Sequence, residues 1–135
     1  MSAMQFGDKI YASDCITGWA FYEKSHTILH KVIENRDVNS ACNYAKHTDL
    51  IDKTTCLNIT PLFMMLQYSI VADFSPAIKI LVDKKLELKT NFNTFFENIN
   101  LAKKHGNIYI QRLLDKLKSS IGEKKYKIIM KDINY

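Results

Sequence analysis

A short pattern of polar and apolar residues recurs along the chain at a fixed interval. Thr-Ile-Leu-His-Lys-Val at residues 27–32 is followed 33 positions later by Thr-Pro-Leu-Phe-Met-Met at residues 60–65, and a fainter copy begins at Thr94. A threonine is a suitable helix N-cap, and Pro61 would occupy the first helical position, where its missing N–H costs nothing. The pattern therefore predicts three helices that open at Thr27, Thr60 and Thr94.

Each of these helices is followed by a second apolar stripe at helical spacing. The stripes predict second helices over about residues 38–46, 75–85 and 108–117. A polar stretch at residues 53–58 separates the first pair of helices from the second and predicts an extended finger. The sequence thus predicts an all-α protein with three units of two short helices, covering residues 27–59, 60–93 and 94–118.

The two ends of the chain do not fit the repeated pattern. Residues 1–24 carry Ile16, Trp19, Ala20 and Phe21, which have the spacing of an amphipathic helix that could cap the apolar edge of the first unit. Residues 119–135 predict either a terminal helix that covers the other edge or a frayed tail. Residues 1–135 are then one domain with a cap at each end.

Composition narrows the class of protein. Hydrophobic residues make up 47% of the chain, whereas Gly and Pro number only 4 and 2, which favours helices over a turn-rich β-fold. The longest apolar run, at residues 61–66, is far shorter than the roughly 20 residues that span a bilayer, so no membrane span is expected. Cys15, Cys42 and Cys56 do not form a disulfide framework, which favours a reducing, cytoplasmic location.

The net charge of +5 is concentrated late in the chain. The basic residues of that stretch are Lys103, Lys104, Arg112, Lys116, Lys118, Lys124, Lys125, Lys127 and Lys131. This balance favours acidic partners. A solvated helix face explains it equally well, and a C-terminal helix that binds nucleic acid or an anionic membrane through phosphates stays open as an alternative.

No group of residues has the spacing of a catalytic or metal site. Cys42, His47 and Cys56 are of the types that bind zinc, but their spacing matches no standard ligand pairing. Glu34 and Asp37 stand at helical spacing on a polar surface, and no glycine-rich phosphate loop is present. Nothing local marks a Cys/His nucleophile pair either. We therefore expect a protein that is not an enzyme and that uses no metal or other cofactor.

The recurring segments resemble the ankyrin repeat, a 33-residue unit whose first helix opens with Thr-Pro-Leu-His. Residues 60–62 match this opening, residues 27–30 match it with one replacement, and residues 47–52 resemble the run that follows the second helix. The resemblance covers about residues 27–117. It implies a solenoid in which the His30 imidazole bonds backbone and a threonine hydroxyl, linking neighbouring units.

The sequence also departs from the family pattern. Arg36 stands where a glycine is usual, residues 69–74 form an insertion, and the second finger, residues 89–93, is short. The chain is therefore similar to divergent members of the family, such as those of large DNA viruses or intracellular bacteria, which implies an effector in the cytosol or nucleus of a host. An ordinary helical bundle is the alternative fold.

The resemblance implies a partner-binding surface on the concave side, made by the finger and the outward positions of the first helices. These residues are Lys31, Glu34, Asn35, Lys53, Thr54, Thr55, Leu57, Met64, Gln67 and Tyr68. Met64 and Tyr68 are the strongest candidates, because Met and aromatic side chains are enriched at interface centres, although either residue could instead pack into the core. The implied partner is a host or cellular regulatory protein. A homodimer formed through Trp19 and Phe21, or through residues 126–135, is an alternative.

Overall fold

A computed structural model describes residues 27–55 and 57–131, and most of this part of the chain is helical. The elements are α2 (Ile28–Glu34), α3 (Val38–His47), α4 (Pro61–Tyr68), α5 (Ser75–Glu87), α6 (Asn93–Ala102), the short 3-10 helix η1 (Lys103–His105), α7 (Asn107–Ile121) and α8 (Glu123–Met130). No strand occurs among the described residues. The all-α prediction is confirmed, whereas the predicted N-terminal cap, residues 1–24, lies outside the described residues.

Two of the three predicted helix starts are confirmed. The Thr27 hydroxyl accepts a hydrogen bond from the His30 N–H, and His30 Nδ1 accepts one from the Thr27 N–H, so the two residues form a capping box. The Thr60 hydroxyl accepts from the Phe63 N–H at 3.2 Å. The start predicted at Thr94 is wrong, because the N-cap position of α6 is Phe92, two residues earlier, and Thr94 lies inside the helix.

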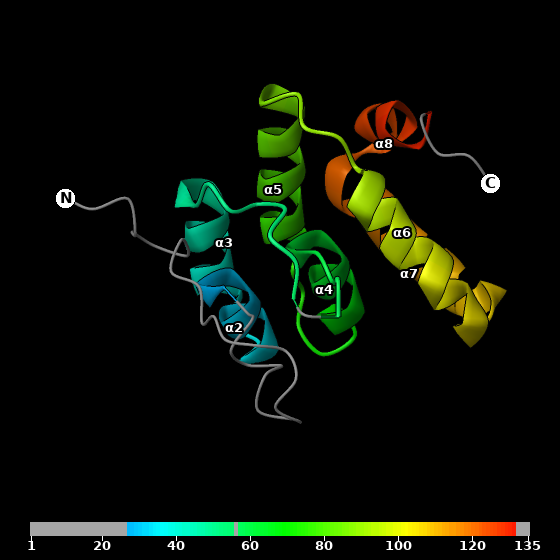
Figure 1. Ribbon diagram of the computed structural model, residues 1–135, viewed down its shortest axis with the longest axis horizontal. Coiled ribbons are helices and arrows are strands. Elements are labelled where there is room, and N and C mark those ends of the chain that lie inside the picture. The colour runs from blue at the N-terminus through cyan, green and yellow to red at the C-terminus, as the bar shows by residue number, and fades with distance from the viewer. Residues whose placement is uncertain (1–26, 56, 132–135) are drawn as a thin grey trace.

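The helices form two packed rows, which Figure 1 shows as successive pairs along the molecule. In one row α2 packs on α4 and α4 packs on α6; in the other, α3 packs on α5 and α5 packs on α7. Helix α8 packs on α7, and Ile129 of α8 is buried. The terminal helix predicted as one alternative for the C-terminal end is therefore present over Glu123–Met130.

The buried positions of the first row keep the 33-residue interval through all three units. Leu29, Leu62 and Phe95 are buried, as are Ile33, Leu66 and Ile99. In the second row Ala77 and Leu81 of α5 are followed 33 positions later by Ile110 and Leu114 of α7, all buried. The interval from Ala41 to Ala77 is three residues longer, because the turn at residues 69–74 carries extra residues.

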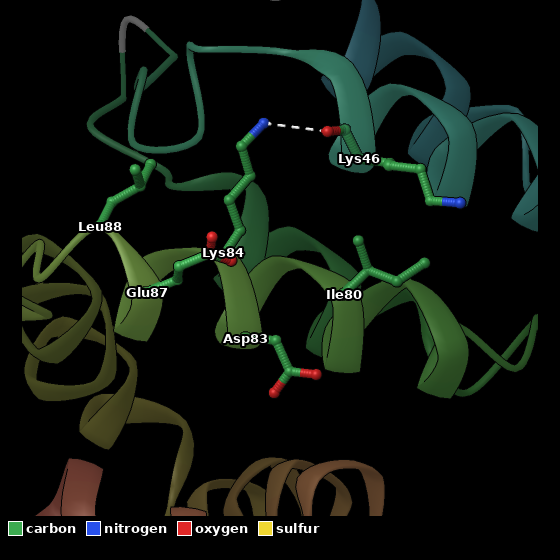
Figure 2. A pocket seen from close by; sticks show the side chains of 6 residues that line it. All are labelled: Lys46, Ile80, Asp83, Lys84, Glu87 and Leu88. Carbon is green, nitrogen blue, oxygen red and sulfur yellow. Dashed lines mark hydrogen bonds between the residues drawn. The ribbon is translucent and has the colours of Figure 1, made fainter.

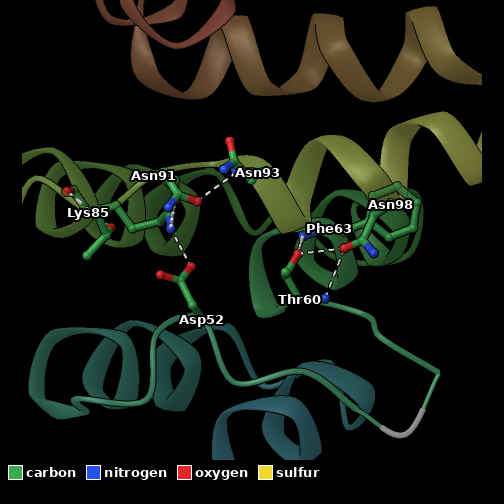
Figure 3. Close-up of polar contacts among 8 residues, drawn as sticks. Asp52, Thr60, Phe63, Lys85, Asn91, Asn93 and Asn98 are labelled. Carbon is green, nitrogen blue, oxygen red and sulfur yellow. Dashed lines mark hydrogen bonds and ion pairs between the residues drawn. The ribbon is translucent and has the colours of Figure 1, made fainter. Parts of the chain in front are cut away.

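The connections between successive units differ in length. Residues 48–60 form the first connection, from α3 to α4, whereas the second connection, from α5 to α6, is only residues 88–92. Burial lowers the pKa of Lys85, near the end of α5, while its ion pair with Asp52 of the first connection opposes that shift. Lys85 also donates to the Asn91 carbonyl at 2.8 Å and lies over the Phe92 ring. One buried lysine thus joins the two connections (Figure 3).

Part of the positive charge of the C-terminal half is used to attach helices to one another. Lys116 of α7 pairs with Asp73, which precedes α5, at 2.8 Å, and Lys125 of α8 pairs with Asp83 of α5. Hydrogen bonds from Lys116 and Ser75 hold the pKa of Asp73 far below its ordinary value. Two of the late lysines therefore serve packing between helices.

Candidate protein-binding groove

A groove of about 280 Å³ lies where the first connection meets α4, α6 and the start of α7. Its lining residues are Leu57 and Ile59 of the first connection, Phe63 and Gln67 of α4, Asn98, Leu101 and Ala102 of α6, Lys104 and His105 of η1, and Tyr109 of α7. The groove therefore draws on five parts of the fold. We refer to it as the α4–α6 groove.

Its surface combines a buried apolar floor with exposed apolar walls. Phe63 and Ala102 are buried, whereas Leu57 is 55% exposed and Leu101 is 64% exposed. No residue of the second connection lines the groove. The second connection is too short to extend over α6 in the way that the first connection extends over α4. Leucines exposed around a hollow gain free energy when a partner covers them, at roughly 25 cal/mol per Å² of apolar area.

A buried amide fixes the geometry of the groove. Asn98 Oδ1 accepts from the Thr60 N–H at 3.0 Å and from the Thr60 hydroxyl at 2.8 Å, and Asn98 Nδ2 donates to the Asn58 carbonyl at 2.6 Å. Figure 3 shows Asn98 and Thr60 joined beside Phe63. These bonds hold α6 against the end of the first connection, so the groove is rigid and little ordering entropy is lost when a partner binds.

The far wall of the groove has a polar and aromatic edge. Gln67 Nε2 donates to the Tyr109 hydroxyl at 3.5 Å, across from α4 to α7. The rings of His105 and Tyr109 meet edge to face with centroids 5.6 Å apart. Amphipathic aromatic side chains of this kind are favoured at protein interfaces because they offer large contact area with few rotatable bonds.

The structure divides the partner-binding residues predicted from the sequence. Leu57 and Gln67 line the α4–α6 groove, and Lys53 is exposed on the finger with Thr54 half-buried beside it. Thr55 is buried instead, because its hydroxyl accepts from the Leu57 and Ile59 N–H groups and shapes the finger.

The outward position predicted for Met64 is wrong. Its side chain is only 6% exposed and belongs to the core, because almost the whole of the short helix α4 is enclosed by its neighbours. Met64 therefore offers no surface to a partner, and the alternative that it packs into the core is the correct one.

The remaining predicted residues lie on α2 or at the ends of α2 and α4, outside the groove. They are Lys31, Glu34, Asn35 and Tyr68. Tyr68 is half-buried, and burial, followed by the nearby Glu34 carboxylate, raises the pKa of its hydroxyl. These residues lie on the first unit and at the end of the first helix of the second unit.

Sequence reasoning missed the contribution of the third unit to the groove. Leu101, Lys104, His105 and Tyr109 all line it. A signal for Leu101 was present, since it stands 33 positions after Tyr68 and is the apolar residue of α6 that leaves the buried stripe. The contribution of Tyr109 depends on the path of the chain through η1 and Gly106, which the repeat does not specify.

A second hollow lies on the other row of helices, between α3 and α5 (Figure 2). It is lined by Lys46, Ile80, Asp83, Lys84, Glu87 and Leu88. Lys84 donates to the Lys46 carbonyl at 3.1 Å and to the Thr48 carbonyl, where it satisfies the C-terminal end of α3. Asp83 is paired with Lys125. Because these charges already serve helix packing, the hollow is a weaker binding candidate than the α4–α6 groove.

The residues considered for metal or nucleophilic chemistry are not gathered together. Cys42 is half-buried on α3, and burial raises the pKa of its thiol, which reduces its nucleophilicity at neutral pH. His47 is exposed at the end of the same helix, and Cys56 lies outside the described residues. Within residues 27–55 and 57–131, no three His, Cys, Asp or Glu side chains are placed to hold a metal ion.

No helix of the described part of the chain has the length and apolar character needed to cross a membrane. Comparison with protein-family models, with curated proteins and with solved structures finds no match to this chain. The groove itself is therefore the basis for inferring what the protein does.

Proposed function

We propose that this chain is a divergent ankyrin-repeat protein that binds another protein and is not an enzyme. Three features support the repeat identity: the 33-residue interval of buried residues, the packing of each unit on the next, and the capping box at Thr27 and His30. His30 Nε2 also lies 3.3 Å from the Ile59 carbonyl, at the boundary with the second unit, and this supports the backbone contact that the resemblance implies. Arg36 adopts a positive φ of 62°, the conformation for which glycine is favoured.

The α4–α6 groove carries the functional proposal. Its exposed leucines, Leu57 and Leu101, lie beside a rigid floor, an arrangement suited to a side chain of a partner protein. At about 280 Å³ the groove is at the lower limit for pockets that enclose a whole small molecule, which favours a protein segment as the ligand. The partner class we propose is a regulatory protein of the cell or host in which this chain acts.

Site-specific photocrosslinking tests this function. A photoreactive phenylalanine analogue placed at Leu101 should crosslink to a partner in extracts, and the crosslinked protein is then identified by mass spectrometry. The matched position is Leu88, which is 56% exposed and lines the hollow between α3 and α5 instead. Crosslinks from Leu101 but not from Leu88 are expected.

Leucine-to-glutamate variants provide an independent check on the same pair of positions. Leu101→Glu should abolish retention of the crosslinked partner, since it places a carboxylate in the apolar wall, while Leu88→Glu should retain it. Loss of the partner with Leu88→Glu alone would move the site to the other row of helices and contradict the proposal. Far-UV circular dichroism of both variants establishes that they fold.

A further inference from the structure

The charged side chains that line the α4–α6 groove are basic. No acidic side chain lines it, while Lys104 and His105 form its rim on η1. Glu97 of α6 does not line the groove and accepts from Asn58 Nδ2 at 3.4 Å. An anionic group that enters the groove beside Lys104 therefore meets positive charge first.

Lys104 lines the groove and differs from three other lysines of the C-terminal half, which are held in ion pairs. Lys116, Lys125 and Lys127 are paired with Asp73, Asp83 and Glu123, respectively. Lys104 is exposed and takes part in no ion pair with a described residue. Its charge is thus available to a ligand, whereas the charges of Lys116, Lys125 and Lys127 are paired within the fold.

The start of α7 adds to the positive potential at the same rim. Gly106, with a φ of 101°, turns the chain from η1 into α7, and no side chain caps the first N–H groups of that helix. Its first turn carries no acidic residue. The positive end of the helix dipole is therefore not neutralised from within the described chain.

We propose that the ligand of the groove is an acidic segment of a partner protein with one large apolar side chain. The apolar side chain would pack against Leu57 and Leu101, and a flanking carboxylate would lie against Lys104. This inference rests on the proposed function and adds the chemistry of the partner. Nucleic acids and anionic membranes suit the site less well, because phosphate binding without apolar contact requires several clustered cations rather than a single lysine beside two leucines.

Selection from a library of random 12-residue peptides displayed on phage, with the whole chain as bait, tests this inference. Selected sequences should combine a Leu, Phe or Trp with neighbouring Asp or Glu. The affinity of a fluorescein-labelled selected peptide, measured by fluorescence anisotropy, should fall about two- to fivefold with Lys104→Gln, as expected for an interaction between exposed charges. A peptide with its Glu residues changed to Gln should bind both proteins equally.

Lys124→Gln is the matched control, because Lys124 is an exposed lysine of α8 that does not line the groove. It lowers the net charge equally and should leave peptide affinity unchanged. Equal weakening by Lys104→Gln and Lys124→Gln would overturn the inference in favour of general electrostatic attraction, as would tighter binding of RNA or phosphatidylserine vesicles than of the peptide.

The result also separates this inference from the function on which it rests. Peptides without acidic residues that bind wild type but not Leu101→Glu would overturn the acidic ligand and leave protein binding at the groove intact. Selected peptides whose affinity is insensitive to both Lys104→Gln and Leu101→Glu would overturn the groove itself as the binding site.

Discussion

The two joints between successive units are built differently. At the first joint, between α2 and α4, the chain makes the long first connection, and His30 reaches the Ile59 carbonyl at 3.3 Å. At the second joint, between α4 and α6, the connection is short and the amide of Asn98 makes shorter bonds, of 2.6–3.0 Å, to Asn58 and Thr60. At the second joint, where the connection is short, α4 and α6 are held together by the buried side chain of Asn98. The outer face of α6 becomes accessible.

The largest effect that distinguishes the joints is expected for Asn98→Leu. The substitution leaves the buried Thr60 N–H without its acceptor and should lower the free energy of unfolding by about 2–4 kcal/mol, because an unsatisfied buried polar group costs about 1–3 kcal/mol. His30→Leu should cost about 1 kcal/mol less, because its bond to the Ile59 carbonyl is longer and the Thr27 hydroxyl can still accept from the backbone N–H of residue 30. Urea denaturation followed by circular dichroism measures both, and the reverse order would contradict this account of the joints.

An intermediate effect is expected at the contact that links the two connections. Asp52→Asn removes the anion that faces the buried Lys85 ammonium and should destabilise the fold by about 1–2 kcal/mol, less than for a fully buried pair because Asp52 is 44% exposed. Lys85→Met removes the buried charge but keeps an apolar chain, so it should cost less than about 1 kcal/mol. Thermal unfolding of both variants and of the double variant separates the charge from the packing contribution.

The smallest effect concerns backbone conformation in the two connections. Lys89 of the second connection and Asn58 of the first have φ values of 57° and 65°. Lys89→Gly should stabilise the protein by about 0.5–1 kcal/mol, because a non-glycine residue is strained in this region. Asn58→Gly should change stability by less than about 0.5 kcal/mol, since asparagine tolerates the left-handed conformation. Equal gains in urea denaturation would show that the side chains at the two positions are equally tolerated.

The repeat in the sequence was sufficient to predict the helices and their order. Thr27, Thr60 and Pro61 determine local structure through their own hydrogen bonds or ring geometry, so the helix starts they mark were predicted correctly. Thr94 was mistaken for a cap, whereas α6 begins at Asn93 without a side-chain cap, after a turn in which the Asn91 side chain accepts from the Asn93 N–H. A helix start was predicted correctly from a single threonine only where no neighbouring residue competed for the start of the helix.

The candidate site was harder to predict than the fold. Leu57 and Gln67 follow from the repeat, but Met64 is buried because helix α4 lies between two neighbours, a property of the stack and not of the segment. Lys104, His105 and Tyr109 reach the groove through η1 and the turn at Gly106. Their position depends on packing between residues far apart in the sequence, which the spacing of residue types along the chain does not predict.

The end of the first connection has a consequence for how the molecule folds. The residues from Asn58 to Thr60, where the first unit passes into the second, are held by His30 of the first unit and Asn98 of the third. The ordered form of this short segment therefore requires both outer units to be docked at once. We expect this segment, which both outer units hold, to make unfolding cooperative. The three units should then unfold in a single transition and not one by one from an end.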